Sequence, residues 1–224
     1  AFNFLFVHAD LEADQLRPIV EGVEAGLPED AWAVYTGSNH DAGRLATRWA
    51  QDDPRKARVA LLMLLTLRGT PFLYYGDEIG LPDVPQDAET ALDPVARRTG
   101  DPSRNRDVCR TPMQWSAEPG GGFTTPDAPP WLPFGDLEAH NVAAQKADPS
   151  STLHLVRDLI ALRTSDHALT AGTYETLPAP EGAWAWRRGE RYGVAVNFSD
   201  DAVTVDGLSG RVLIATDRGR DGED

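Results

Sequence analysis

The apolar residues in the first third of the chain recur with two different periods. A period of two, as in the alternating phenylalanines of residues 2–7, is typical of a strand, and a period near 3.6 is typical of an amphipathic helix. The pattern predicts, in order, a strand at residues 2–7, a helix at 11–25, a strand at 32–36, a helix at 54–68 and a strand at 71–75. Strands that alternate with helices in this way indicate parallel βα units and an α/β fold.

Periodicity fades over residues 76–150, where proline, glycine and aspartate are frequent. A loop of this length inside a compact domain is usually functional or disordered. Four embedded aromatic residues favour an ordered, packed loop, because disordered segments are poor in aromatic side chains. They are Trp115, Phe123, Trp131 and Phe134.

The pattern changes again after residue 150. Ser151 is suited to cap a helix that runs to residue 163, and beyond Gly172 short alternating runs are separated by turns. The candidate strands are residues 174–177, 184–188, 193–197, 203–205 and 212–215. We therefore predict two domains, an α/β domain at residues 1–170 and a small antiparallel β domain at residues 171–224.

Composition and charge restrict the classes of partner. The hydrophobic fraction of 41% is sufficient for a packed core, and the net charge of −14 disfavours nucleic acid and anionic membranes, which require basic surfaces. No apolar run approaches the roughly 18–20 residues that span a bilayer. Cys109 is the single cysteine, so an internal disulfide is impossible, and we expect a cytoplasmic protein.

Polar side chains follow the strand predicted at residues 32–36. Ser38, Asn39, His40 and Asp41 lie at its carboxyl end, which in an α/β barrel faces the pocket where chemistry takes place. A His–Asp pair is also common as a structural pair, and both interpretations stay open on these residues alone. A second candidate is the segment at residues 106–115, where an arginine in a loop rich in proline and tryptophan either clamps a polar ligand or holds the loop by an ion pair.

Three motifs occur in order along the chain. The pattern Asn-His-Asp-x-x-Arg is met by residues 39–44, and Arg-Thr-Pro-Met-Gln-Trp is met in full at residues 110–115. Tyr-x-Gly-Glu-Glu-Ile-Gly is matched at residues 74–80, with Asp77 in place of the first glutamate. Together these motifs resemble the α-amylase superfamily, glycoside hydrolase family 13, and within it the α-glucosidase and oligo-1,6-glucosidase branch. The resemblance extends to Thr173.

The resemblance implies the C-terminal part of a (β/α)8 TIM barrel followed by a small antiparallel β-sandwich domain. On this map residues 2–7, 32–36 and 71–75 correspond to barrel strands six, seven and eight, and residues 151–163 to the last barrel helix. We therefore expect a C-terminal fragment, whose partner would be the missing N-terminal half of the same chain.

The resemblance also implies retaining hydrolysis of α-glucosidic bonds in short oligosaccharides, with one carboxylate as nucleophile and another as acid. Asp41 matches the family's third carboxylate, which stabilises the oxocarbenium-like transition state. His40 matches the neighbouring hydroxyl donor, and Arg110 the arginine that closes the glucose pocket. Arg44 is expected near the pocket rim as a further substrate-binding residue. The family's nucleophile and acid end strands four and five, which would precede Ala1, so we expect this chain alone to be inactive.

Two other functions stay open. A trehalose synthase or isomerase-type transglycosylase of the same family shares the retaining intermediate and differs in whether water or a sugar hydroxyl attacks it. A catalytically inactive relative that acts as a binding partner is disfavoured by the presence of His40, Asp41 and Arg110.

Other eye-catching residues have structural interpretations that are at least as good. Asp77 and Glu78 are candidate carboxylates, but a role in orienting the loop is favoured. The remaining histidines lack the spacing of metal ligands, so neither a metal nor a cofactor is expected. Trp115 and Trp131 either stack on sugar or pack the loop.

Overall fold

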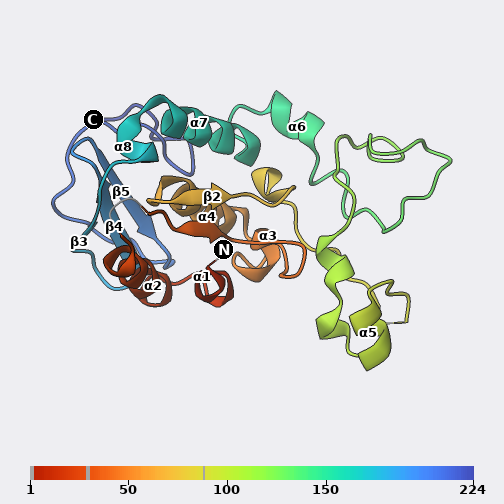
Figure 1. Cartoon of the computed structure of the whole chain (residues 1–224). Coiled ribbons are helices and arrows are strands. Elements are labelled where there is room, and N and C mark those ends of the chain that lie inside the picture. Colours follow the sequence, from red (N-terminus) through yellow and green to blue (C-terminus); the bar gives the residue numbers. More distant parts are fainter. Residues whose placement is uncertain (1–2, 29–30, 88) are drawn as a thin grey trace.

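The structure, a computed structural model, describes residues 3–28, 31–87 and 89–224. Its helices are α1 (Phe4–His8), α2 (Ala13–Gly26), α3 (Leu45–Arg48), α4 (Pro54–Thr66), α5 (Pro94–Thr99), α6 (Val142–Ala147), α7 (Thr152–Ser165) and α8 (His167–Thr170). The 3-10 helices are η1 (Asp77–Ile79), η2 (Pro102–Arg104) and η3 (Arg106–Cys109). The strands are β1 (Val34–Thr36), β2 (Thr70–Phe72), β3 (Tyr174–Leu177), β4 (Ala183–Arg188) and β5 (Tyr192–Asn197) (Figure 1).

Strands β1 and β2 are parallel neighbours, with Val34 opposite Thr70 and Thr36 opposite Phe72. Helices α3 and α4 connect them, so the predicted βα order is confirmed for this part of the chain. Gly69, in the turn that enters β2, has a φ of 141°. A Cβ there would lie 2.7 Å from the Ala33 carbonyl oxygen, so the close approach of the two strands requires glycine.

The strand predicted at residues 2–7 is wrong where the structure describes it. Asn3 caps helix α1, and its Oδ1 accepts a hydrogen bond from the Phe6 amide at 3.2 Å. The helix buries Phe6 and Val7 and leaves Phe4 and Leu5 exposed. Six residues of alternation also fit about one and a half helical turns, and the side-chain cap decides between the two. Ala1 and Phe2 lie outside the described residues.

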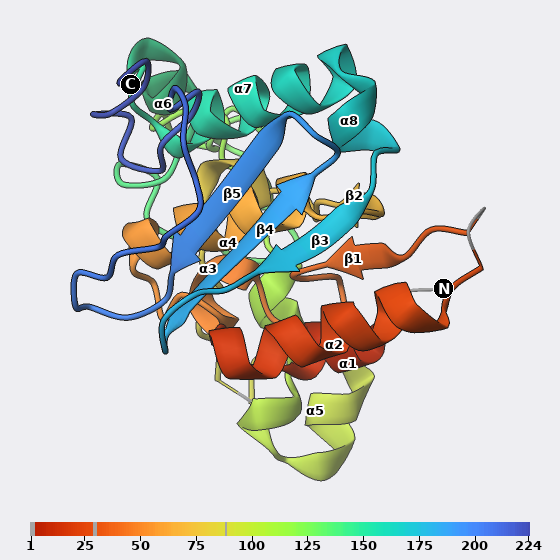
Figure 2. The same cartoon turned by 90° about the vertical axis from the view of Figure 1, so that its left-hand side faces the viewer.

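Helix α4 forms the centre of the core. Asp53 caps it by accepting from the Arg55 amide at 2.8 Å, and Pro54 occupies the first turn, as the sequence predicts. The buried residues of this helix are Ala57, Ala60, Leu61, Leu62, Met63, Leu64, Leu65 and Thr66. Such burial around most of the helix shows that it packs against neighbours on several sides. Figure 2 shows it behind the C-terminal sheet.

The C-terminal segment forms one antiparallel sheet in the order β3-β4-β5. The first three predicted strands are confirmed, whereas residues 203–205 and 212–215 form no strand, and the described residues contain no second sheet that would complete a sandwich. For residues 212–215 the reason lies in the backbone partners. Val212 exchanges hydrogen bonds with the tail, donating to Glu223 and accepting from Gly222 at 2.7 Å each, so this segment pairs with residues after it and not with β5.

The larger of two clusters of buried apolar side chains in the described residues extends from α1 to the C-terminal sheet. It includes Phe6 of α1, Leu61 of α4, Leu159 of α7 and Trp186 of β4. The cluster therefore contains residues from both sides of position 171, and the division into domains at that position stays a prediction. None of the helices in the described parts of the chain is long and apolar enough to cross a membrane.

Two buried arginines hold the carboxyl end of α4. Arg163 of α7 donates to the carbonyls of Leu65 and Leu67 at 2.8 and 2.9 Å, and also to that of Gly69. Arg188 of β4 donates to the Thr66 carbonyl at 2.6 Å. These donors satisfy carbonyls that a helix end leaves unpaired and place positive charge at the negative end of the helix dipole. Burial lowers the pKa of Arg188 to about 10, so it remains charged at neutral pH.

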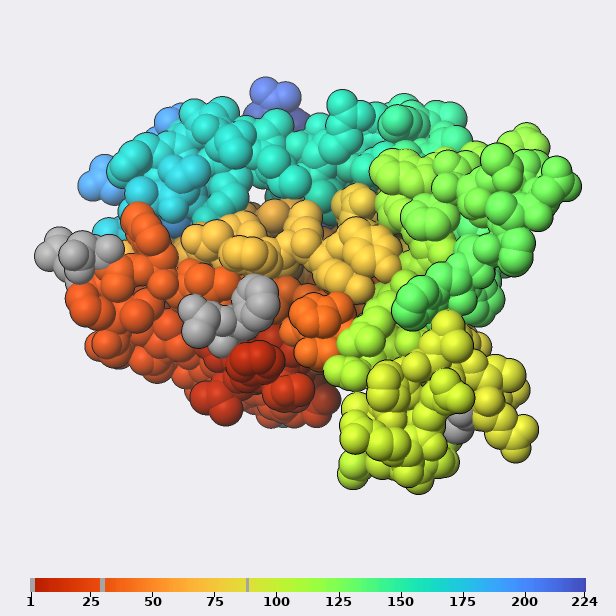
Figure 3. All heavy atoms as spheres, turned by 45° about the vertical axis from the view of Figure 1, so that its right-hand side comes forward, coloured from red at the N-terminus to blue at the C-terminus, as the bar shows by residue number. Residues whose placement is uncertain are grey.

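Residues 76–150 are ordered by short elements with irregular backbone between them. In Figure 3 they form two projections on one side of the molecule, one built around α5 and the other around the segment that leads to α6. Gln145 of α6 joins this region to the core, because it donates to the Ile79 carbonyl at 2.7 Å and accepts from the Leu153 amide at 3.0 Å.

Replacing Arg163 by methionine is expected to lower the free energy of unfolding by about 1–3 kcal/mol, because buried carbonyls at the end of α4 lose their donor. Arg157→Met, an exposed position on the same helix, is the matched control and should stay within about 0.5 kcal/mol of the parent. Urea unfolding of the two variants measures the difference. Equal midpoints would show that the Arg163 contacts contribute nothing net.

Candidate active site

A tight turn follows β1 and presents two polar side chains. The Asn39 side-chain oxygen accepts from the backbone amides of Asp41 and Ala42 at 2.8 and 2.9 Å, which closes the turn. His40 and Asp41 point outward, with 68% and 54% of their side chains exposed. We call this segment the residue 38–42 turn.

Asp41 is the point where charged side chains from two segments converge. Its Oδ1 accepts hydrogen bonds from Arg106 Nη1 and Arg110 Nη2, each at 2.9 Å. His40 Nε2 lies 3.4 Å from the other oxygen. The Arg110 Nε also donates to the His40 carbonyl at 2.8 Å, so it contacts both residues of the pair. The structure thus brings together three of the predicted site residues, Asp41, His40 and Arg110.

Arg106 belongs to this arrangement although the sequence did not single it out as a site residue. It makes a two-pronged contact with Asp93, from Nε to Oδ2 at 2.7 Å and from Nη2 to Oδ1 at 2.9 Å. The Asp93 side chain is fully buried, and the hydrogen bonds from Arg106 hold the pKa of its carboxyl well below the usual range. Arg106 is therefore fixed at one end and reaches Asp41 with the other. The signal in the sequence that could have identified Arg106 was its position in a polar loop.

Arg44, expected at the pocket rim, is instead completely buried. One terminal nitrogen donates to the Tyr75 carbonyl, the other lies 3.4 Å from the Thr111 carbonyl, and the guanidinium lies over the Tyr75 ring at 4.7 Å. Its amide donates to Asp83 at 2.9 Å. In this arrangement Arg44 has no surface for a sugar, and it connects the loops that carry the site. The carbonyl and ring of Tyr75, just after β2, cover the guanidinium. A sequence motif does not show this contact.

Asp77, from the motif at residues 74–80, lies under the same turn. It is buried, and its two oxygens lie 2.7 and 2.6 Å from the Ser38 hydroxyl. The Tyr74 amide donates to it at 2.9 Å. Glu78 beside it accepts from the Gly76 amide at 2.7 Å. Both carboxylates thus contact loop backbone, which supports the loop-orienting interpretation over a catalytic one.

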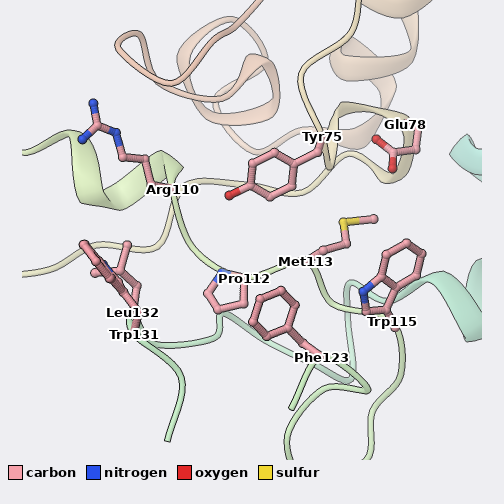
Figure 4. Close-up of a pocket in the computed structure, with 9 residues that line it drawn as sticks. All are labelled: Tyr75, Glu78, Arg110, Pro112, Met113, Trp115, Phe123, Trp131 and Leu132. Carbon is pink, nitrogen blue, oxygen red and sulfur yellow. The ribbon is translucent and has the colours of Figure 1, made fainter.

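A cavity of about 550 Å³ adjoins Arg110. Figure 4 shows Arg110 at one end of it and Glu78 with Trp115 at the other. It is lined by Tyr75, Glu78, Arg110, Pro112, Met113, Trp115, Phe123, Trp131 and Leu132. Its wall is mostly apolar, and Trp131 is 77% exposed, so this side chain is not packed into the loop. In the described residues no group of three acidic, histidine or cysteine side chains is arranged to hold a metal.

Comparison with known proteins agrees with these motifs. The family described as "Alpha amylase, catalytic domain" matches residues 4–172. The chain belongs to this family. It is a family of TIM barrels, which is consistent with the parallel β1 and β2 and the helices between them.

Several family members resemble the chain over most of its length. A probable α-glucosidase of Rhizobium meliloti is 34% identical over 211 residues, which are 91% of this chain and 38% of that protein. An oligo-1,6-glucosidase of Heyndrickxia coagulans is 31% identical and covers 86% of this chain and 39% of that enzyme. The chain therefore spans less than half the length of these relatives.

Solved structures of the family superpose on the chain. The trehalulose synthase MutB of Pseudomonas mesoacidophila has a TM-score of 0.75 at 27% identity, over 84% of this chain and 38% of that one. The α-glucosyl transfer enzyme XgtA has a TM-score of 0.76 at 34% identity, over 90% of this chain and 38% of that one.

Cys109 lies beneath the site and should react slowly. It is buried, with Sγ 3.2 Å from the Arg106 carbonyl and 3.7 Å from that of Asn39, and burial raises its pKa from 9.0 to about 11. Since only the thiolate attacks, a rise of two units lowers the reactive fraction at pH 8 by about 100-fold. Alkylation by iodoacetamide at pH 8 is expected to be at least about 100-fold slower than in the urea-unfolded chain. Comparable rates in the two states would mean that the loop does not cover the thiol.

Proposed function

We propose that this chain is part of a retaining glycoside hydrolase of α-glucosidase type, acting on α-glucosidic bonds of short oligosaccharides. The observation that carries the proposal is the contact of Arg106 and Arg110 with one oxygen of Asp41 at the end of β1, with His40 beside it. Family membership and the α-glucosidase relatives support the same reaction class.

In the proposed reaction Asp41 contacts the sugar in its glucose subsite. One Asp41 oxygen is held by the two arginines, and the other lies near His40, so sugar hydroxyls would be met by a carboxylate of fixed orientation. Hydrogen bonds to the sugar that strengthen as positive charge develops at the ring lower the barrier. His40 would donate to a neighbouring hydroxyl, and Arg110 would close the subsite. Arg44 would act as a positioning residue.

Retaining hydrolysis needs a nucleophile and an acid as well. We propose that both lie in sequence outside these 224 residues, with β1 and β2 as strands seven and eight of the complete barrel. We also propose that the catalytic domain ends near residue 170 and that the chain needs the other half of that domain as its partner. The proposal places the protein in the cytoplasm, because its single cysteine fits a reducing compartment.

An isomerase or glucosyl transferase is the second candidate. Two of the solved relatives carry such names, a trehalulose synthase and an α-glucosyl transfer enzyme, at 27% and 34% identity. Both reactions pass through the same glucosyl-enzyme intermediate, and they differ from hydrolysis in the acceptor. Product analysis with sucrose and maltose separates the three outcomes. For each bond cleaved, hydrolysis releases both the glucosyl unit and the leaving sugar, transfer releases only the leaving sugar, and isomerisation releases neither.

The chain alone is expected to release no product from an aryl α-glucoside, because Asp41 supplies neither the attacking group nor the leaving-group proton. Purified residues 1–224 are assayed by release of the aryl alcohol, with the urea-inactivated sample as the blank. Turnover above that blank, in material free of host glucosidase, would place a nucleophile and an acid within these residues and contradict this part of the proposal.

In the protein expressed from its whole reading frame, Asp41→Asn is expected to lower kcat by roughly 10²–10³, the effect of losing one charged transition-state contact. Asp206→Asn, an exposed carboxylate in the C-terminal segment, is the matched control and should leave kcat unchanged. Arg110→Lys should reduce kcat/KM as well, because lysine lacks the planar fork that reaches both Asp41 and the His40 carbonyl.

Unchanged kinetics in Asp41→Asn, with the melting temperature preserved, would remove Asp41 from the site. A lower melting temperature with unchanged kinetic constants in Arg110→Lys would show that Arg110 only holds the loop.

A further inference from the structure

One buried carboxyl joins the ends of the two parallel strands beneath the candidate site. Asp77 follows β2, and Ser38 follows β1, and the Ser38 hydroxyl lies within 2.7 Å of both Asp77 oxygens. Each residue is only 1% exposed. The Ser38 carbonyl in turn accepts from the Thr36 hydroxyl at 2.6 Å, so Ser38 is fixed on the β1 side. The contact therefore connects the residue 38–42 turn to the β2 end.

The surroundings of Asp77 do not neutralise it. Arg44 and Arg48 from the α3 region and Glu78 of η1 are the charged groups that act on it, and within the described residues no basic nitrogen lies within 4 Å of its oxygens. Burial raises the pKa of Asp77 from 3.8 to about 6, against the opposing effect of the Ser38 and Tyr74 hydrogen bonds.

A carboxyl in this place is costly to the fold at neutral pH. An asparagine would offer the same oxygen to the Tyr74 amide and an amide group to Ser38, without a charge to bury. Buried ionisable groups that the fold does not need are concentrated at functional sites. Asp77 lies directly under the residue 38–42 turn and contacts Ser38, so the turn is the segment that Asp77 can hold in place.

We propose that Asp77 is a positioning residue that holds the residue 38–42 turn, and with it His40 and Asp41, by its contact with Ser38 across the ends of β1 and β2. The inference rests on the proposed function, because it assigns Asp77 to the subsite that Asp41 and His40 would form. It adds a condition on that subsite, namely that the state of one buried carboxyl controls the order of the turn.

The sign of the pH effect follows from proton linkage. The pKa of Asp77 is higher in the folded chain than in a state where it reaches water, so proton binding favours the closed turn. This contribution is fully present below about pH 3.8 and is lost as the pH rises through about 6. The turn should therefore be most firmly held in weak acid and should loosen toward neutral pH. Two pKa units limit the change to about 100-fold in the opening equilibrium.

Cys109 offers a direct probe of this opening. It is the single cysteine of the chain, and its sulfur lies against the Asn39 carbonyl, so a thiol reagent reaches it when the turn lifts. Labelling rates, corrected for the pH dependence of a model thiol, give the opening equilibrium. Amide exchange of Asp41 and Ala42, expressed as protection factors, reports the same event, and amides of Leu62 in the buried helix α4 report global unfolding.

The test compares the parent chain, Asp77→Asn, Ser38→Ala and the exposed control Asp127→Asn at pH 5 and pH 7.5. In the parent and in Asp127→Asn, protection of Asp41 and Ala42 is expected to be about 10-fold higher at pH 5 than at pH 7.5. Asp77→Asn has no titratable group, so its protection should be the same at both values. Ser38→Ala should lower protection at pH 5 by at least about fivefold, because it removes the bridging hydroxyl.

The proposal is overturned if the parent shows equal protection at the two pH values, or if Asp77→Asn keeps the parent's pH dependence. Should Ser38→Ala fail to fold, the comparison of Asp77→Asn with the parent still decides. None of these measurements requires turnover. A pH-dependent turn, together with no glucosidase activity in the protein expressed from its whole reading frame, would overturn the proposed function alone. Activity of that whole protein with a pH-independent turn would overturn only the role of Asp77.

Discussion

The buried guanidinium of Arg44 is the contact on which the geometry of the site depends. It lies three residues after Asp41 and donates to the carbonyl of Tyr75 at the β2 end, with the Thr111 carbonyl next to Arg110 on its other side. A single planar group thus fixes the spacing between the residue 38–42 turn and the loop that supplies Arg110. Lysine could not replace Arg44, because the planar guanidinium contacts two carbonyls and a tyrosine ring at the same time.

The two carboxylates that pair with Arg106 differ in burial. Arg106 is anchored by Asp93, a carboxylate that is fully buried and strongly paired. Asp41, which that arginine reaches, is half exposed, where an ion pair alone contributes little to stability. The arrangement therefore orients one oxygen of the Asp41 carboxylate, while the side chain as a whole stays half exposed.

The sequence predicted those features that depend on local pattern. Helices α2, α4 and α7 have long periodic runs with caps such as Asp53 and Ser151, and they were found with only their ends displaced. The segment at residues 2–7 was too short for its period to be decisive, and the Asn3 cap made it helical.

For the site, the motifs pointed to Asp41, His40 and Arg110, which the structure brings into contact. The motifs did not reveal the burial of Arg44 or the role of Arg106, because these depend on partners at a distance in the chain, Thr111 for the first and Asp41 for the second. Loss of the expected strand at 212–215 has a similar origin, since Val212 pairs with the tail.

Arg163 and Arg188 at the end of α4 limit which segments of this fold can be replaced by segments of another protein. Arg188 comes from the C-terminal sheet, yet its charge serves a helix whose next residues form β2 and lead to Tyr75. A protein in which an unrelated module replaced this sheet would lack the Arg188 donor to the buried Thr66 carbonyl, just before β2. The sheet and helix α4 therefore depend on each other, and chimeras between family members should be joined outside the stretch from α4 to β4.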